Sequence, residues 1–144
     1  MNEIDSANQL FLQKKFEKAI QKYNQILKIE PENLIALNNK GYALSKLKRF
    51  DDAIICYDKS LKIKPNDKVV LINKISVFRK IGNIQNALKL CDYLLEKYPD
   101  EIIVLYHKLR LLKKQEKYDE ANLICEKILN DYPNNVEIRN ELIK

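Results

Sequence analysis

Residues 34–67 have the sequence LIALNNKGYALSKLKRFDDAIICYDKSLKIKPND, which contains two apolar patterns and then a proline. In the first pattern Leu37, Gly41 and Leu44 recur at three- and four-residue steps, so they share one face of an α-helix. The second pattern has the same spacing from Ala53 onward. The stretch therefore predicts a hairpin of two amphipathic helices.

The hairpin pattern returns along the chain with a period of 34 residues. All four prolines follow this period: Pro31, Pro65, Pro99 and Pro133. So do two further sets, which are Ala19, Ala53, Ala87 and Ala121, and Phe16, Phe50, Ile84 and Tyr118. A fixed period of this length is the signature of a repeat architecture. We predict four repeats, at about 1–33, 34–67, 68–101 and 102–135.

The residues between the patterns predict where the helices begin and end. Each proline should stop a second helix, because it lacks an amide donor and disfavours helical angles in the preceding residue. We expect the turn inside the hairpin at 48–50 in the second repeat and at 82–83 in the third. Asn33, Asp67 and Asp100 follow the prolines and are candidate N-caps of the next first helix. We find no convincing strand.

This pattern resembles that of the tetratricopeptide repeat, which has a large apolar residue at position 4, a small one at position 8, Ala at 20, an aromatic at 24 and Pro at 32. The second repeat supplies Leu37, Gly41, Leu44, Ala53, Tyr57 and Pro65. The resemblance covers about residues 2–135. It implies an all-α fold, an α-solenoid in which four hairpins form a right-handed superhelix. We expect one domain over residues 1–144, closed by a short C-terminal capping helix at 136–144 built on Val136, Ile138, Leu142 and Ile143.

Small and large side chains exchange places between positions 8 and 24 of the repeats. The pairs are Ala7 with Tyr23, Gly41 with Tyr57, Ile75 with Cys91, and Leu109 with Cys125. If the two positions share the space between the helices, the exchange conserves volume, which protein cores tolerate. The cysteines are then packing residues.

Position 7 is a lysine in three repeats, namely Lys40, Lys74 and Lys108. A lysine stem can lie along apolar surface while its ammonium group reaches water. We therefore expect an outward-facing ladder of lysines.

The composition excludes several classes of protein. With 46% hydrophobic residues, 32% charged residues, 2 Gly and 4 Pro, the chain is not of a disordered or collagen-like type. Three cysteines are too few to form a disulfide framework, and Glu3 and Asp5 stand where a secretory signal would be basic. No apolar run approaches the ~20 residues needed to span a bilayer. We expect a cytoplasmic protein without a membrane segment.

The chain offers little catalytic chemistry. Its single histidine, His107, has no cysteine or carboxylate at metal-site spacing, and Cys56, Cys91 and Cys125 are far apart. Two isolated glycines cannot form a phosphate-binding loop. We predict no catalytic residues, no metal and no cofactor.

The resemblance implies that the first helices line a concave groove. The peptide-binding residues that it predicts are Asn38, Asn39, Tyr42, Lys46, Asn73, Ser76, Arg79, Lys80, Tyr106, Arg110, Lys113 and Lys114. Ile35, Val69 and Ile103 map to the same face. Asparagine amides can donate to and accept from a peptide backbone, whereas either tyrosine could instead pack on a neighbouring helix.

Charge is segregated between the two classes of helix. Residues 34–48, 68–82 and 102–115 together contain eleven basic residues and no acidic one. A wall of one sign attracts a partner of the other sign. We therefore expect a non-enzymatic interaction module that binds an acidic or amide-rich segment of another protein, although the lysines could simply solvate exposed positions.

Two other functions remain open. The chain ends, or an apolar patch of Ile4, Phe11 and Leu12, could pair two copies into a homo-oligomer. Nucleic-acid binding through the basic face is a weaker alternative, because the net charge is only +6 and no aromatic and basic residues alternate as a stacking platform.

Overall fold

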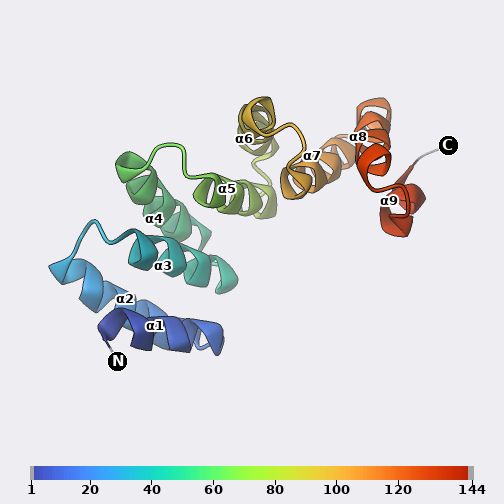
Figure 1. Ribbon diagram of the computed structural model, residues 1–144. Helices are drawn as coiled ribbons and strands as arrows, with labels where there is room; N and C mark the ends of the chain where they lie inside the picture. The colour runs from blue at the N-terminus through green and yellow to red at the C-terminus, as the bar shows by residue number, and fades with distance from the viewer. Residues whose placement is uncertain (1, 143–144) are drawn as a thin grey trace. The chain divides into compact units, whose positions relative to one another are not determined.

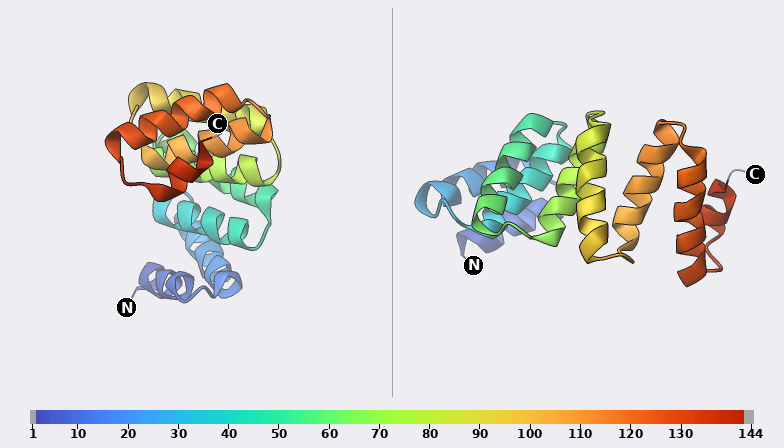
Figure 2. Two further views of the ribbon diagram at one scale, coloured as in Figure 1. Left: turned by 90° about the vertical axis from the view of Figure 1, so that its right-hand side faces the viewer. Right: turned by 90° about the horizontal axis from the view of Figure 1, so that it is seen from above.

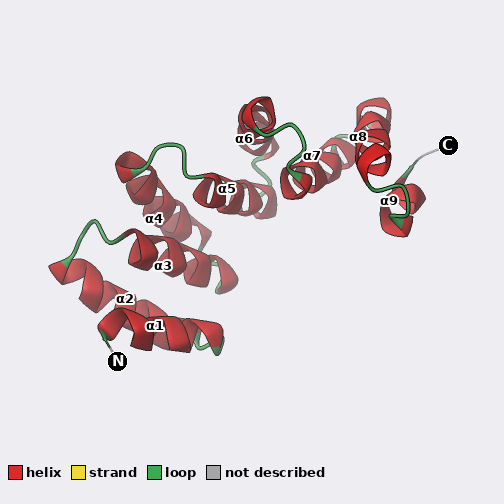
Figure 3. Ribbon diagram, viewed as in Figure 1, coloured by secondary structure: helices red, strands yellow, loops and turns green. Residues whose placement is uncertain are grey.

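The computed structural model describes residues 2–142, and its regular structure there is entirely helical (Figures 1 and 3). The helices are α1 (Glu3–Leu12), α2 (Phe16–Ile29), α3 (Leu34–Lys46), α4 (Phe50–Ile63), α5 (Lys68–Lys80), α6 (Ile84–Lys97), α7 (Ile102–Lys114), α8 (Tyr118–Asp131) and α9 (Val136–Glu141). The predicted all-α fold of helical hairpins is thereby confirmed. No helix within residues 2–142 combines the length and apolarity required to cross a membrane.

The chain divides into two compact units, Met1–Val77 and Phe78–Lys144, with the boundary inside α5. In the first unit α1 packs on α2, α2 on α3, and α3 on α4. In the second unit α6 packs on α7, α7 on α8, and α8 on the short α9. Consecutive helices are joined by short connections, as the two views of Figure 2 show.

The prolines set the helix ends. Every second helix ends two residues before its proline, and the next first helix begins three residues after it. Asn33 caps α3 by accepting a hydrogen bond from the amide of Ala36 at 3.0 Å. Asp67 accepts from the amide of Val69 at 3.1 Å. Both N-cap predictions are confirmed.

The third N-cap prediction, Asp100, is wrong. The residue at the cap position of α7 is Glu101, whose side chain makes no capping hydrogen bond. Asn33 and Asp67 lie two residues after their prolines, and that phase falls on Glu101 after Pro99. The extra methylene of glutamate makes it a poorer cap than aspartate or asparagine.

The turns inside the hairpins share one backbone geometry. A left-handed residue with positive φ follows each first helix, and these residues lie 34 positions apart: Lys14 (59°), Lys48 (61°), Gly82 (80°) and Glu116 (59°). The next amide donates back into the helix, for example from Arg49 to the carbonyl of Leu44 at 2.9 Å. This is the hydrogen bond of a Schellman motif, which satisfies the last carbonyls of a helix.

One boundary differs from expectation at these turns. Gly82 and Asn83 lie between α5 and α6, as predicted. Phe50, which we expected within the turn, is the first residue of α4.

The core follows the sequence lattice. The four period alanines, from Ala19 to Ala121, are at most 1% exposed. Tyr57 is 1% exposed, and its ring fills the space that a Cβ of the buried Gly41 would take. Positions 8 and 24 therefore share the space between the helices in the second repeat. Each of the other three pairs is buried as well.

The predicted C-terminal cap is present in part. α9 buries Ile138 to 1% exposure in a cluster with Leu109 and Ile128, and Leu142 packs on the same cluster. Val136 is 66% exposed and does not contribute to the cover, because it occupies the first turn on the outer side of the helix. Ile143 lies outside the described residues, as do Met1 and Lys144.

Candidate peptide-binding surface

Six of the predicted groove residues belong to the first unit. They are Asn38, Asn39, Tyr42 and Lys46 on α3, and Asn73 and Ser76 on α5. Lys46 is exposed and the other five are half-buried. The amides and rings on this face are therefore partly used by the fold itself.

Asn39 belongs to a polar cluster built from three helices. Its side-chain nitrogen donates to Oδ1 of Asn8 on α1 at 3.0 Å, and the hydroxyl of Tyr23 on α2 donates to the same oxygen at 2.6 Å. Burial raises the pKa of Tyr23, so its hydroxyl remains a donor at neutral pH. The cluster fixes the orientation of Asn39 before any ligand arrives.

Asn38 differs from its neighbour. Its side-chain oxygen is buried and has no hydrogen-bond partner within the described part of the chain. A buried, unpaired acceptor costs stability. This oxygen is not open to a ligand, which narrows the predicted role of Asn38 to its amide nitrogen.

Tyr42 packs on the neighbouring helix α1. Its ring centroid lies 5.4 Å from that of Phe11, which in turn lies 5.9 Å from the ring of Phe16. The ammonium of Lys46 lies 5.2 Å from the centre of the Tyr42 ring, within the range of a cation–π contact. Of the predicted apolar patch, Ile4 and Phe11 are half-buried and only Leu12, at 77%, is widely exposed.

The other six predicted residues belong to the second unit. Lys80, Arg110 and Lys114 are exposed, and Arg79, Tyr106 and Lys113 are half-buried. They lie near the C-terminal end of α5 and along α7.

Arg79 and His107 form the most perturbed part of this surface. Nε of Arg79 donates a hydrogen bond to Nδ1 of His107 at 3.3 Å, so this ring nitrogen is unprotonated. Burial, Arg79, Arg110 and Lys80 lower the pKa of His107 to about 4. Burial and the charge of Arg110 also lower the pKa of Arg79. The charges that lower these two pKa values are all positive, and we call Arg79, Arg110 and the neutral ring of His107 the cationic centre.

An open pocket of about 320 Å³ adjoins this centre and is lined by Ile103, Tyr106, His107, Arg110 and Glu137. Glu137, from α9, is the only acidic residue in that lining. The arrangement can hold an anionic group beside one or two guanidinium groups.

Residues of α9 and its N-cap contact two of the predicted groove residues. Lys113 forms an ion pair with the carboxylate of Glu141 and approaches the carbonyl oxygen of Glu141 at 3.4 Å. The hydroxyl of Tyr106 accepts a hydrogen bond from the side-chain nitrogen of Asn135 at 2.9 Å. Lys113 is therefore not a free positive charge of the surface.

The lysine ladder also differs from expectation. Lys74 pairs with Asp58 at 2.7 Å and Lys108 pairs with Asp92 at 2.8 Å, so these ammonium groups meet carboxylates of the preceding second helices. Both lysines are half-buried, and their ammonium groups are paired at the surface instead of extending alone into water. The segregation of charge that the sequence displays is partly cancelled across helices.

Sequence reasoning did not select three residues that shape this part of the surface. His107 mapped to the groove, but its proximity to Arg79 depends on how α5 and α7 pack. Glu137 and Glu141 could not be placed, because the orientation of a six-residue terminal helix does not follow from the period. Within the described residues no group of three or more His, Cys, Asp and Glu side chains is arranged to hold a metal ion.

Comparison with known proteins identifies the repeats. The tetratricopeptide repeat family model matches residues 35–67, and a second one, described as TPR repeat, matches residues 7–48. No curated protein matches the sequence significantly.

Solved structures share the fold at low sequence identity. A tetratricopeptide repeat protein from Parabacteroides merdae has a TM-score of 0.86 and 19% identity, and the match covers 96% of this chain and 54% of that one. This chain thus spans about half the length of the Parabacteroides protein. MamA from Desulfovibrio magneticus RS-1 has a TM-score of 0.83 and 18% identity, with 99% and 82% covered.

YrrB, described as a tetratricopeptide-repeat protein with an unusual peptide-binding site, has a TM-score of 0.81 and 16% identity, with 97% of this chain and 72% of that one covered. Identities this low establish the fold alone. Residues 7–67 match tetratricopeptide-repeat family models, and nearly the entire chain has the fold of these repeat structures.

Proposed function

We propose that this chain is a non-enzymatic interaction module whose first helices bind an acidic or amide-rich peptide segment of a partner protein. Tetratricopeptide repeats are in general protein-interaction repeats. The three cysteines are buried and unpaired, which supports a reducing, cytoplasmic location.

The observation that carries the proposal is the cationic centre, in which the guanidinium groups of Arg79 and Arg110 act on the neutral ring of His107. Burial lowers the pKa values of Arg79 and His107. The positive charge of Arg110 acts in the same direction on both, so the positive charges there repel one another. An incoming carboxylate would relieve this repulsion, and two guanidinium groups favour such a ligand. Lys80 and Lys114 extend the positive surface.

Apolar side chains add to the surface of the first helices in both units. Ile35, Val69 and Ile103 occupy one position of three successive first helices and are 54%, 61% and 50% exposed. Each first helix thus presents an apolar side chain near its amides or cations. A segment with aliphatic side chains among its acidic residues would use both features.

A binding assay with a defined peptide tests the proposal. The probe is a short fluorescent peptide in which glutamate alternates with leucine, and its control carries glutamine in place of each glutamate. We expect the acidic peptide to raise the fluorescence anisotropy on binding, and the affinity to fall as salt is added. The double variant Arg110→Glu/Lys114→Glu should bind it at least about tenfold more weakly, which is ~1.4 kcal/mol.

A matched control separates site from net charge. Lys89→Glu/Lys117→Glu reverses the same amount of charge at exposed positions on α6 and just before α8. This control should retain binding. Equal losses in the two double variants, or full binding by Arg110→Glu/Lys114→Glu, would overturn the proposal. A labelled oligonucleotide in the same assay measures the nucleic-acid alternative.

Self-association is the second candidate function, and one observation favours it. Ile29 at the end of α2 is 83% exposed and lines an open pocket of about 370 Å³ with Ile26, Gln25, Glu3 and Glu30. A second copy could cover this surface. Light scattering over a range of concentrations tests it, and a monomeric mass throughout would exclude it.

A further inference from the structure

A second candidate site lies on the first unit, away from the proposed groove. It becomes apparent through the lysines of position 7. Lys74 pairs with Asp58, and Lys108 with Asp92, at 2.7 and 2.8 Å. In both cases the aspartate precedes the lysine by 16 residues and comes from the preceding second helix.

Lys40, the first lysine of this series, has no aspartate at the equivalent position. The residue 16 positions before Lys40 is Asn24, on α2, so a neutral amide replaces the carboxylate. Lys40 is half-buried and, within residues 2–142, forms no ion pair. The fold therefore presents a lysine at a place built for an ion pair, without its counter-charge.

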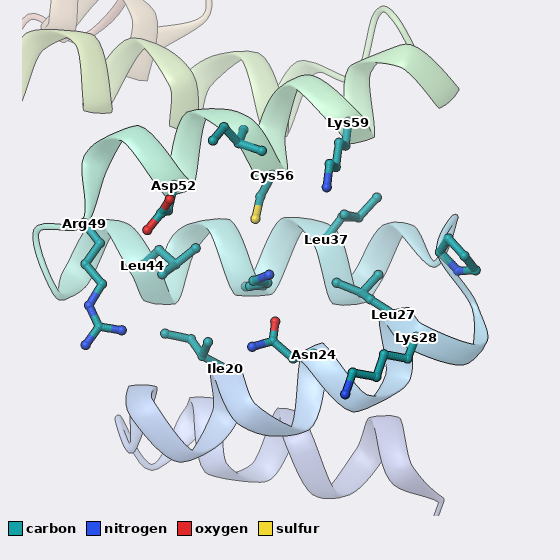
Figure 4. Close-up of a pocket in the computed structure, with 13 residues that line it drawn as sticks. Ile20, Asn24, Leu27, Lys28, Leu37, Leu44, Arg49, Asp52, Cys56 and Lys59 are labelled. Atoms are coloured by element: carbon teal, nitrogen blue, oxygen red, sulfur yellow. The ribbon is translucent and has the colours of Figure 1, made fainter.

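Lys40, on α3, lines an open pocket of about 700 Å³ whose other lining residues come mainly from α2 and α4. Figure 4 shows Asn24 and Lys28 reaching into it from α2, and Cys56 and Lys59 from the α4 side. This is a larger cavity than the one beside Arg110.

The pocket has an excess of positive charge. Its basic lining residues are Lys28, Lys40, Arg49 and Lys59, and Asp52 is its only acid. Arg49 is neutralised by Glu17, with nitrogen–oxygen distances of 2.8 and 3.1 Å. The three lysines have no ion-pair partner in the described part of the chain.

The pKa of the Cys56 thiol is affected by the same lysines. Burial raises its pKa, Lys40 and Lys59 act in the opposite direction, and Asp52 raises it to a lesser extent. Both ammonium groups therefore lie close enough to the buried wall of the pocket to influence it.

Apolar side chains complete the lining. Leu27, Leu37 and Ile55 line it together with the lysines, and Ile55 is 51% exposed. A ligand that carries only charge would leave this surface in water. A ligand with a carboxylate and an apolar body would use both parts.

We propose that this pocket binds a carboxylate attached to an apolar body, with the carboxylate paired to Lys40 in the role that Asp58 and Asp92 play in the later repeats. Lys28 and Lys59 contribute further positive charge, and the aliphatic residues contact the apolar body. The chemistry is shared by a free organic acid and by a glutamate flanked by leucines in a peptide.

The site is independent of the groove. On a helix that turns by about 100° per residue, Lys40 points about 200° away from Asn38 and Tyr42. The same helix α3 can thus serve two surfaces, and loss of one does not imply loss of the other.

Titration by isothermal calorimetry and by amide NMR tests the site, with hexanoate and a capped Leu-Glu-Leu peptide as probes. Hexan-1-ol and a capped Leu-Gln-Leu peptide are the neutral controls. We expect at least one carboxylate probe to bind and to shift the amide signals of Asn24 and Leu27, and neither neutral control to do so. Binding of hexanoate alone indicates a free acid, and binding of the peptide indicates a protein partner.

The decisive variant is Asn24→Asp, which restores the counter-charge of the later repeats and should therefore fold. It should lower probe affinity about tenfold or more, and Lys40→Gln should do the same. Gln21→Glu adds the same charge at an exposed position one turn away on α2, outside the pocket, and should leave affinity within about twofold. The proposal is overturned if neither carboxylate probe binds, if Asn24→Asp and Lys40→Gln bind like the original chain, or if Gln21→Glu loses as much.

Discussion

The ring of Tyr57 fills the space where a side chain of Gly41 would stand: a Cβ on Gly41 would lie 2.6 Å from Cε1 and 2.9 Å from Cδ1 of the tyrosine. Gly41→Ala should therefore destabilise the fold although alanine is the better helix former by about 1 kcal/mol. The buried ring cannot move away without disturbing its neighbours, and overpacking of this kind costs about 1–3 kcal/mol. Urea denaturation measures the change.

The later repeats suggest the compensating variant. Gly41→Ile with Tyr57→Cys copies the pair formed by Ile75 and Cys91. The double variant should be more stable than the sum of the two single changes predicts, because each residue fills the space that the other vacates. Additive losses would show that the two positions do not compensate.

The buried histidine should make stability depend on pH. Its pKa is about 4 in the folded chain and about 6.5 when unfolded, so between these values the unfolded chain binds a proton that the folded chain does not. The stabilisation is complete above pH 6.5 and is lost as the pH falls toward 4. The loss amounts to roughly 2 kcal/mol at pH 5. Arg79, Lys80 and Arg110 oppose protonation, and Glu137 lines the same pocket.

Comparison with His107→Gln isolates this effect from the carboxylates. Both chains should lose stability in acid, but the original should lose roughly 2 kcal/mol more between pH 7 and pH 5. Parallel urea midpoints of the two chains over that range would contradict the assignment.

The terminal helix should contribute to stability through one side chain. Ile138→Ala removes a group that is 1% exposed and should destabilise the second unit by about 2 kcal/mol or more. Val136→Ala, on the same helix at 66% exposure, should change stability by less than about 0.5 kcal/mol. Thermal unfolding followed by circular dichroism distinguishes the two, and equal effects would mean that α9 does not dock as described.

The thiols should be unreactive while the chain is folded. Burial raises the pKa of Cys91 to about 12, and burial also raises those of Cys56 and Cys125. At pH 8 the thiolate that attacks a disulfide reagent is therefore scarce. Ellman's reagent should label all three cysteines in urea and label the native chain far more slowly. Rapid labelling of a native thiol would contradict this packing.

Much of the fold could be predicted from sequence because its determinants are local. A proline ends the helix before it wherever it stands, and a face of Leu37, Gly41 and Leu44 identifies a helix without knowledge of its partner. The prediction of Asp100 as an N-cap was wrong because two adjacent acids, Asp100 and Glu101, follow Pro99 and either could have been the cap. The left-handed backbone conformation of Lys14, Lys48 and Glu116 could not be predicted, because none of these residues is a glycine.

The candidate sites were less predictable because they depend on contacts between helices. The pairs of Lys113 with Glu141 and of Tyr106 with Asn135 require the docking of α9. In the sequence, Asn24 stands where Asp58 and Asp92 stand in the later repeats. This difference indicates a missing ion pair only once the structure shows that Lys74 pairs with Asp58.

The hairpin turns leave room for the protein to be strengthened without altering either proposed ligand surface. Lys14, Lys48 and Glu116 hold a backbone conformation that costs an ordinary residue about 1–2 kcal/mol, whereas the equivalent turn has glycine at position 82. Since the three turns are separate in the chain, glycine substitutions there should raise the melting temperature in nearly independent steps. An engineer, or a lineage under heat, could thus offset the destabilising changes that a new binding preference introduces elsewhere.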